Sequence, residues 1–194
     1  MIIKFLKKND NFKLNIFIFF SLIALILRIW VSQYGSNFDF ASWQANLDIF
    51  KDGKSVYENG NYVYAPPWVY TLYFLDLIYF PFFENNSFVQ SIPGNFFRFK
   101  LVIFLGLLDI SIFYLLYKKY SLKVGLLFLI NPISIWLSGF HNSFDNYAII
   151  FGFLSVILYG EINEEKFTFK KIFAIFLFGL SIAIKHILIF FIFW

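Results

Sequence analysis

Long apolar runs separated by short polar stretches fill most of the 194-residue chain. Several of these runs approach the roughly 20 residues that a helix needs to cross a hydrocarbon core about 30 Å thick. The pattern therefore predicts an all-α fold, a polytopic membrane bundle made of one domain over residues 1–194. The apolar runs cover residues 14–34, 66–83, 99–117, 121–139, 146–160 and 172–194.

Composition indicates the same class of protein. Hydrophobic residues make up 60% of the chain, charged residues 14%, and the mean hydropathy is +0.70, whereas soluble domains carry about 25% charged residues. The sequence has no cysteine, which excludes disulfides and thiolate metal sites. The net charge of +4 reports the orientation of the spans and not a nucleic-acid partner. We predict an integral, multi-pass protein with the lipid bilayer as a partner.

The cations that lie between the apolar runs decide which runs cross the membrane. If residues 66–83 crossed, eight of these cations would lie outside and five inside, against the positive-inside rule. If residues 66–83 stay outside, ten cations lie inside, and the outer loop holds Lys51, Lys54 and Arg98. We therefore predict five spans, at residues 14–34, 99–117, 121–139, 146–160 and 172–194.

The run at residues 66–83 has the composition of a juxtamembrane element within an outer loop over residues 35–98. Prolines disfavour a continuous spanning helix, and Trp and Tyr favour the membrane interface. The first span follows a basic stretch and has no small-residue cleavage site after it, so we predict an uncleaved anchor. The residues that mark the juxtamembrane element are Pro66, Pro67, Pro81, Asp76, Trp68, Tyr70, Tyr73 and Tyr79.

The outer loop carries the first candidate for chemistry. Ser36 or Asn37 can cap a helix that begins near Asp39, and Asp39 and Trp43 then lie on one face, four residues apart. Two interpretations fit this spacing. One is a solvated helix with a favourable acid in its first turn. The other is a carboxylate held at the lipid surface as a general base.

The predicted topology places the polar turn "GFHNSFDN" on the same outer side. His141 and Asp145 are four residues apart and would meet if the turn were helical, although a hydrated turn also explains them. Asp109 lies within a predicted span, where burying a carboxylate costs at least about 2.5 kcal/mol. It is therefore either a functional acid or a structural partner for a cation such as Arg28.

The last predicted span carries Lys185 and His186 in its outer half. Lys185 lies roughly 20 Å along a helix that rises 1.5 Å per residue from the inner side. A cation at that depth either extends toward the outer surface or binds a lipid phosphate. The sequence contains no HExxH box, phosphate-binding glycine loop or nucleophile elbow, and we predict no metal site from it.

The order of these features resembles the GT-C superfamily of membrane glycosyltransferases. A basic N-terminus and one span precede the outer loop "NFDFASWQANLDIFKDGKSVYEN" and the element "YVYAPPW". A later "NP" is followed by "GFHNSFDN", and a lysine lies toward the outer end of a span. The likeness covers most of the chain. It is to enzymes that use polyprenyl- or dolichyl-phosphate sugars, including glucosyltransferases and mannosyltransferase-like enzymes.

The resemblance implies an inverting hexosyltransferase whose active face is periplasmic or extracellular, or lumenal in a eukaryote. Asp39 would be the catalytic base that takes the proton of an acceptor hydroxyl on a glycan, lipid or protein. Preorganised cations would stabilise the departing lipid phosphate. A divalent cation assists some such enzymes, and no other cofactor is implied. The residues implied in substrate binding are Asp48, Tyr64, Arg98, His141, Asn142, Asp145, Lys185 and His186.

Members of that superfamily usually have more than five spans, so we expect this sequence to be an N-terminal portion that is incomplete at its C-terminus. Two other functions remain open at this point. A membrane transporter or lipid flippase component would use Asp109 and Lys185 along a translocation path. A non-catalytic assembly subunit would use neither residue for chemistry.

Overall fold

The structure is a computed structural model that describes residues 10–58, 62–160 and 168–185. Every regular element within these ranges is helical, which confirms the all-α class for this part of the chain. The elements in chain order are α2 (Asp10–Val31), η1 (Ser32–Tyr34), α3 (Phe38–Lys51), α4 (Pro66–Leu77), α5 (Pro81–Glu84), α6 (Ser87–Gln90), α7 (Asn95–Lys119), α8 (Leu122–Leu129), α9 (Pro132–Trp136), η2 (Leu137–His141), α10 (Asp145–Gly160) and α11 (Phe169–Ile184).

Two of the described helices are long and apolar enough to cross a membrane. They cover Phe12–Tyr34 and Phe96–Lys119, and α8 with α9 and η2 makes a third if this bent pair is one span. Helix α10 is apolar but has 16 residues. The run predicted at 172–194 is described only as far as Lys185. These lengths indicate membrane association, and the count of five spans stays a prediction.

The run predicted at 121–139 is not one straight helix, because α8 and α9 meet at a bend of 46°. Pro132 has no N–H, and its ring keeps the preceding Asn131 in an extended conformation. The Asn131 side chain then accepts a hydrogen bond from Ile133 N at 2.9 Å, which starts the next helix. The break leaves the Leu129 carbonyl without a helical donor, and Arg28 Nη2 donates to it at 3.2 Å.

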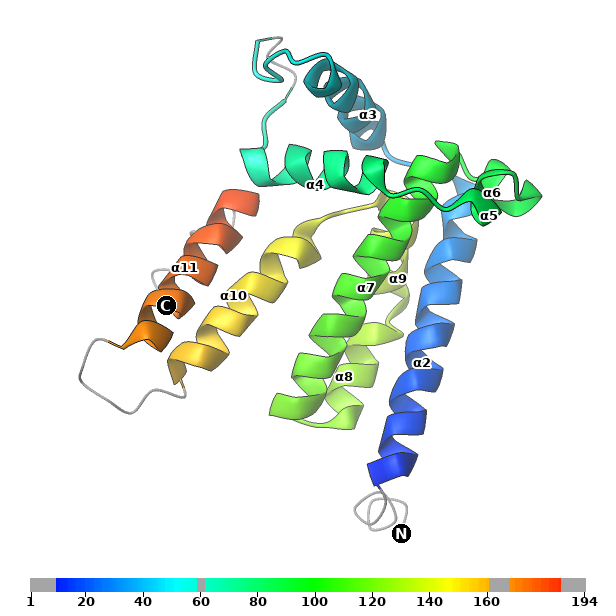
Figure 1. Ribbon diagram of the computed structural model, residues 1–194. Coiled ribbons are helices and arrows are strands. Elements are labelled where there is room, and N and C mark those ends of the chain that lie inside the picture. The colour runs from blue at the N-terminus through cyan, green and yellow to red at the C-terminus, as the bar shows by residue number, and fades with distance from the viewer. Residues whose placement is uncertain (1–9, 59–61, 161–167, 186–194) are drawn as a thin grey trace.

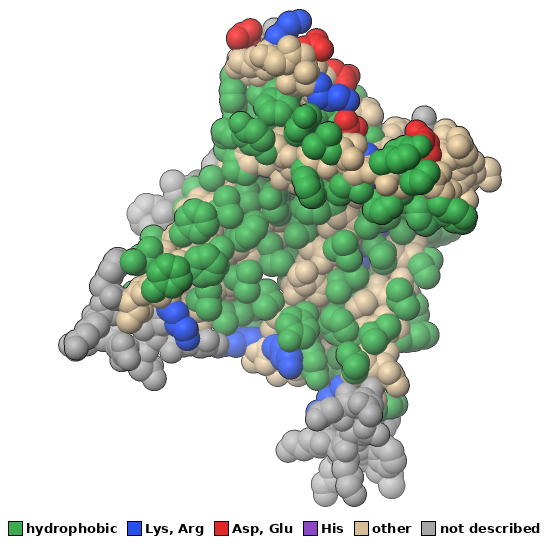
Figure 2. Space-filling view, viewed as in Figure 1, with side chains coloured by type: hydrophobic (Ala, Val, Ile, Leu, Met, Phe, Trp, Pro, Cys, Tyr) green, Lys and Arg blue, Asp and Glu red, His purple; other side chains and the backbone are tan. Residues whose placement is uncertain are grey.

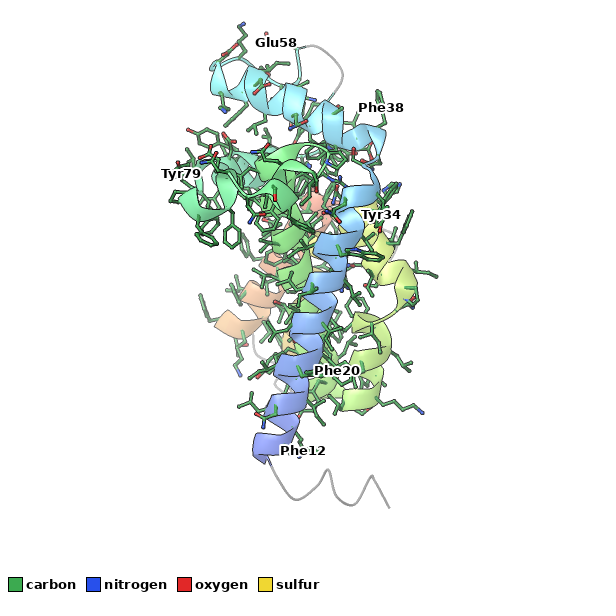
Figure 3. The ribbon with its side chains drawn as sticks, turned by 90° about the vertical axis from the view of Figure 1, so that its right-hand side faces the viewer. Phe12, Phe20, Tyr34, Phe38, Glu58 and Tyr79 are labelled. Atoms are coloured by element: carbon green, nitrogen blue, oxygen red, sulfur yellow. The ribbon has the colours of Figure 1, made fainter. Side chains whose placement is uncertain are left out.

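Figure 1 shows α2, α7, α10 and α11 running lengthwise through the molecule, with α3 and α4 across one end. We call this the upper end; it also holds the starts of α7 and α10. The lower end holds the starts of α2, α8 and α11. Figure 3 shows Phe12 at the lower end of α2, Tyr34 at its upper end, and Glu58 beyond α3. Helix α4 lies crosswise to the lengthwise helices (Figure 1).

The largest group of buried apolar side chains lies at the upper end and joins α3, α4, α7 and α10. Trp68 of α4 stacks on Phe144 with ring centroids 4.1 Å apart. Trp43 of α3 meets both rings edge-on, at 5.1 Å from Trp68 and 5.6 Å from Phe144. Aromatic pairs in this geometry add about 0.5–1.5 kcal/mol each beyond their burial. The packing fixes the start of α10 beneath α3 and α4.

Charged side chains are distributed unevenly between the two ends. On the face drawn in Figure 2, acidic side chains lie at the upper end together with some lysine or arginine, whereas the lower end shows lysine or arginine alone. The lower lysines lie at the ends of helices that begin or finish there. They are Lys13 of α2, Lys118 and Lys119 of α7, Lys123 of α8, and Lys170 and Lys171 of α11.

Candidate functional site

The start of α3 brings Asp39 and His141 together through one amide. Asn37, one of the two capping residues that the sequence offered, is the N-cap of α3, and its Oδ1 accepts from Phe40 N at 3.1 Å. Because Oδ1 faces the backbone of α3, Nδ2 of the same amide points away from it. Nδ2 lies 3.3 Å from Asp39 Oδ2 and 3.0 Å from His141 Nδ1. Asn37 therefore bridges Asp39 to His141, which lies 104 positions after Asn37 in the sequence.

The same amide determines the tautomer of His141. An amide nitrogen has protons to donate and no lone pair to accept with, so His141 Nδ1 is the acceptor in this contact. The ring proton of the neutral imidazole then lies on Nε2. His141 and Asp39 are both exposed, and the pair presents an N–H donor and a carboxylate acceptor on one surface.

The turn after His141 is not helical, and no hydrogen bond or ion pair joins His141 to Asp145; the helical pairing, one of the two interpretations of their spacing, is therefore not observed. Helix η2 ends at His141, Asn142 adopts a left-handed conformation with φ 58°, and α10 begins at Asp145. Asp145 instead pairs with Lys185: Nζ lies 2.7 Å from Oδ1. Ser143 Oγ donates to Asp145 Oδ2 at 2.8 Å.

Partial burial alone would raise the pKa of Asp145. The bonds from Lys185 and Ser143 and the charge of Lys185 outweigh burial, and the pKa lies below its usual value. Asp145 is therefore a carboxylate at neutral pH. We call Asn37, Asp39, His141, Asp145 and Lys185 the upper polar cluster.

Aromatic side chains border the upper polar cluster. Lys185 Nζ lies 4.7 Å from the centroid of the Phe144 ring, and Tyr64 meets Phe144 edge-on at 5.0 Å. Burial raises the pKa of Tyr64, the negative charge of Asp39 raises it further, and the charge of Lys185 acts in the opposite direction. Tyr64 is thus within electrostatic reach of both ends of the cluster. The buried indole N–H group of Trp68, in the same aromatic group, has no hydrogen-bond partner among the described residues.

Arg98 lies outside the upper polar cluster, and its side chain has no exposed surface. Nε donates to Asn142 Oδ1 at 2.7 Å. The other nitrogens donate to backbone carbonyls on two segments of the chain and on the residues just before α7. These carbonyls belong to Ser32, Gly35, Pro93, Gly139 and Phe140.

The remaining predicted site residues are placed in three ways. Asn142 is buried, and its Nδ2 donates to the carbonyls of Ser138 and Gly139, so it holds the turn beneath His141. Asp48 is exposed and lies nine residues beyond Asp39 on α3, roughly 13 Å along the helix. His186 lies outside the described residues.

A second buried polar group lies lower in the bundle, around the acid that the sequence singled out. Arg28 Nε lies 2.7 Å from Asp109 Oδ2, and both side chains are fully buried. Ser138 Oγ donates to the same carboxylate oxygen at 2.7 Å, and Asn146 Nδ2 donates to Asp109 Oδ1. Arg28 Nη2 also donates to Ser134 Oγ at 3.0 Å. The structural alternative for Asp109, a pair with Arg28, is the one observed.

An apolar cavity of about 500 Å³ lies within the bundle. It opens between α7, α8, α10 and α11, and its lining includes Ile112, Phe128, Phe153 and Phe178. Within the described ranges, no three His, Cys, Asp or Glu side chains lie close enough together to hold a metal ion.

No protein-family model, curated protein or solved structure matches this chain.

Proposed function

We propose that this chain belongs to a membrane glycosyltransferase of the GT-C type. The enzyme would move a sugar from a polyprenyl- or dolichyl-phosphate donor to an acceptor hydroxyl at the outer membrane face, with inversion at the anomeric carbon. The observation that carries the proposal is the Asn37 bridge between Asp39 and His141. It joins, at one end of the bundle, two of the motifs on which the sequence resemblance rests.

The upper polar cluster offers a group for each step of the transfer. Asp39 accepts the proton of the acceptor hydroxyl while that oxygen attacks the anomeric carbon from the face opposite the phosphate. The bond from the anomeric carbon to the phosphate oxygen breaks, and the lipid phosphate leaves with the electron pair. Lys185 and the Nε2–H of His141 stabilise its growing negative charge. Asp145 holds Lys185 in place, and Tyr64 borders the sugar.

The distribution of charge supports an outward-facing upper end. The lower end carries Lys118, Lys119, Lys170 and Lys171, as expected for the inner side of a five-span protein. Helix α4 would then lie along the outer surface as the juxtamembrane element. The apolar cavity would lie at the depth of the bilayer, where it suits the hydrocarbon chain of a lipid-linked donor.

The transporter alternative has less support, because both of its residues already have charged partners. Asp109 is buried against Arg28 and receives hydrogen bonds on both carboxylate oxygens. Lys185 pairs with Asp145 at the upper end. A translocation path would require both pairs to open.

Asp39→Asn tests the catalytic assignment. We expect transfer from polyprenyl-phosphate sugars to fall by at least about 10²-fold, because the amide cannot accept the proton, while expression in membranes is unchanged. Asp52→Asn is the matched control, since Asp52 is exposed at the far end of the same helix and belongs to no proposed site, and it should retain most of the activity. Normal transfer by Asp39→Asn would reject the base assignment.

A labelling experiment tests the proposed orientation separately. The sequence has no cysteine, so Ser55→Cys and Ser121→Cys each introduce a single thiol. Ser55 follows α3 at the upper end, and Ser121 caps α8 at the lower end. In intact cells an impermeant maleimide should label Ser55→Cys and not Ser121→Cys. Labelling of both or of Ser121→Cys alone would contradict the orientation.

A further inference from the structure

Arg98 lies between the two segments that carry the upper polar cluster. Of its six acceptors, the carbonyls of Ser32 and Gly35 lie just before Asn37 and Asp39 in the sequence. The other acceptors, apart from the Pro93 carbonyl, flank His141. They are the carbonyls of Gly139 and Phe140 and the side chain of Asn142. We propose that Arg98 is a positioning residue that fixes the spacing between the Asp39 segment and the His141 turn.

The acceptors explain why a buried cation is stable at this position. Helix η1 ends at Tyr34 and η2 ends at His141, and the last carbonyls of a helix have no partner within it. Each helix C-terminus also carries about half a negative charge, so two C-termini together offset one guanidinium. Among the described side chains, no carboxylate lies within ion-pair distance of Arg98. Arg98 therefore connects two helix ends that would otherwise be held apart by their like partial charges.

The shape of the guanidinium matters as much as its charge. Arginine has five N–H donors in a rigid plane, whereas lysine has three donors on one nitrogen and cannot reach both helix ends in the same way. The direct contact between Asn37 and His141 is a single exposed hydrogen bond, which is too weak to hold two segments alone. The catalytic meaning of the spacing rests on the proposed function, because a misplacement of about 1 Å can cost 10²-fold in rate.

Cross-linking measures this spacing without any substrate. Asn37→Cys with His141→Cys gives a thiol pair across the two segments, and Lys51→Cys with Asp76→Cys gives a control pair between α3 and α4, whose native side chains are 2.8 Å apart. Both pairs are tested in the full chain in membranes with a short bis-maleimide. Arg98→Lys should slow cross-linking of the 37–141 pair by about tenfold and leave the 51–76 pair unchanged.

An unchanged rate for the 37–141 pair in Arg98→Lys would overturn the proposal. Slowing of both pairs would also overturn it, because Arg98 would then support the whole upper end and not one spacing. Asn142→Gly is a milder second variant: it removes the side-chain acceptor and suits the φ of 58°. It should slow the 37–141 pair by about threefold, and no change would count against the proposal. Failure of the Asp39→Asn experiment leaves this result unaffected, so the two proposals can fail separately.

Discussion

Two buried arginines hold helix η2, but their charges are balanced differently. Arg28 of α2 bonds to Ser138 of η2, and its charge is balanced by the carboxylate of Asp109. Arg98 of α7 bonds to the next residues of η2, Gly139 and Phe140, and its charge is balanced by two helix C-termini. Helix η2 packs closely against α2, because a Cβ on Gly139 would lie 2.7 Å from the Arg28 carbonyl oxygen.

This difference in charge balance predicts how sensitive the surroundings of each arginine are to substitution. In a buried ion pair, one side chain balances the whole charge of the other. Removing that partner leaves an unpaired charge in an apolar bundle. At helix C-termini, several backbone carbonyls balance the charge of the arginine together, and no side-chain substitution removes these carbonyls. We therefore expect the contact around Arg28 to be sensitive to a single substitution and the contact around Arg98 to be tolerant.

The largest effect is expected from Asp109→Ala. It leaves the Arg28 guanidinium buried without a carboxylate, and breaking a buried pair in this way costs about 3–5 kcal/mol. The measurement is the free energy of unfolding in detergent micelles, from denaturant titration followed by tryptophan fluorescence. A loss below about 1 kcal/mol would show that Asp109 is not the main balance for Arg28.

The double variant Arg28→Met with Asp109→Leu controls for the loss of packing. It removes both charges and keeps much of the side-chain volume, so most of the stability lost in Asp109→Ala should return. If the double variant is less stable than Asp109→Ala, the ion pair contributes stability beyond charge compensation.

A smaller effect is expected from Asn142→Gly at the other arginine. Asn142 provides the one side-chain acceptor among the six groups bonded to Arg98. Its loss removes a hydrogen bond to a charged group, worth about 1.5–3 kcal/mol. Glycine also relieves the left-handed backbone strain at this position, so the measured loss of unfolding free energy should be about 1–2 kcal/mol. A loss equal to that of Asp109→Ala would remove the contrast between the two arginines.

Some of this arrangement could be predicted from the sequence because it depends on local spacing. A Ser or Asn just before a helix predicts an N-cap, and Asn37, one of the two candidates, is the cap of α3. An acid within an apolar run requires a partner, and the pairing of Asp109 with Arg28 was one of the two interpretations left open. The bend at Asn131 and Pro132 also has a local signal, since proline disfavours a helix before it. A span over 121–139 would therefore be bent at this point.

The role of Arg98 could not be predicted in the same way. Five of its acceptors are backbone carbonyls, and every residue has a carbonyl, so no residue type marks such a site. The contact between Asp145 and Lys185 depends on how α10 and α11 pack, and the spacing of His141 and Asp145 suggested a different pair. That spacing misled because it assumed a helix through Asn142, where the chain turns left-handed.

The smallest effect is expected at the ion pair of the upper polar cluster, where a half-exposed pair can be compared with the buried one. The side chains of Lys185 and Asp145 are 26% and 47% exposed, and exposed pairs contribute about 0–1 kcal/mol. Lys185→Met should therefore lower the unfolding free energy at pH 6 by less than about 1 kcal/mol. A loss as large as that of Asp109→Ala would show that the exposure of an ion pair does not determine its contribution to the unfolding free energy.

The dependence on pH identifies the source of this small loss. The pKa of Asp145 is lowered in the folded chain, so its contribution is present above the unfolded value of about 3.9 and disappears as the pH falls through the folded value. The difference between wild type and Lys185→Met should shrink from pH 6 to about pH 2.5. Protonation of other acids affects both chains alike and cancels from the difference. A remainder is expected at low pH, because Lys185 also lies over the Phe144 ring, and a difference that does not change with pH would assign the whole effect to that ring contact.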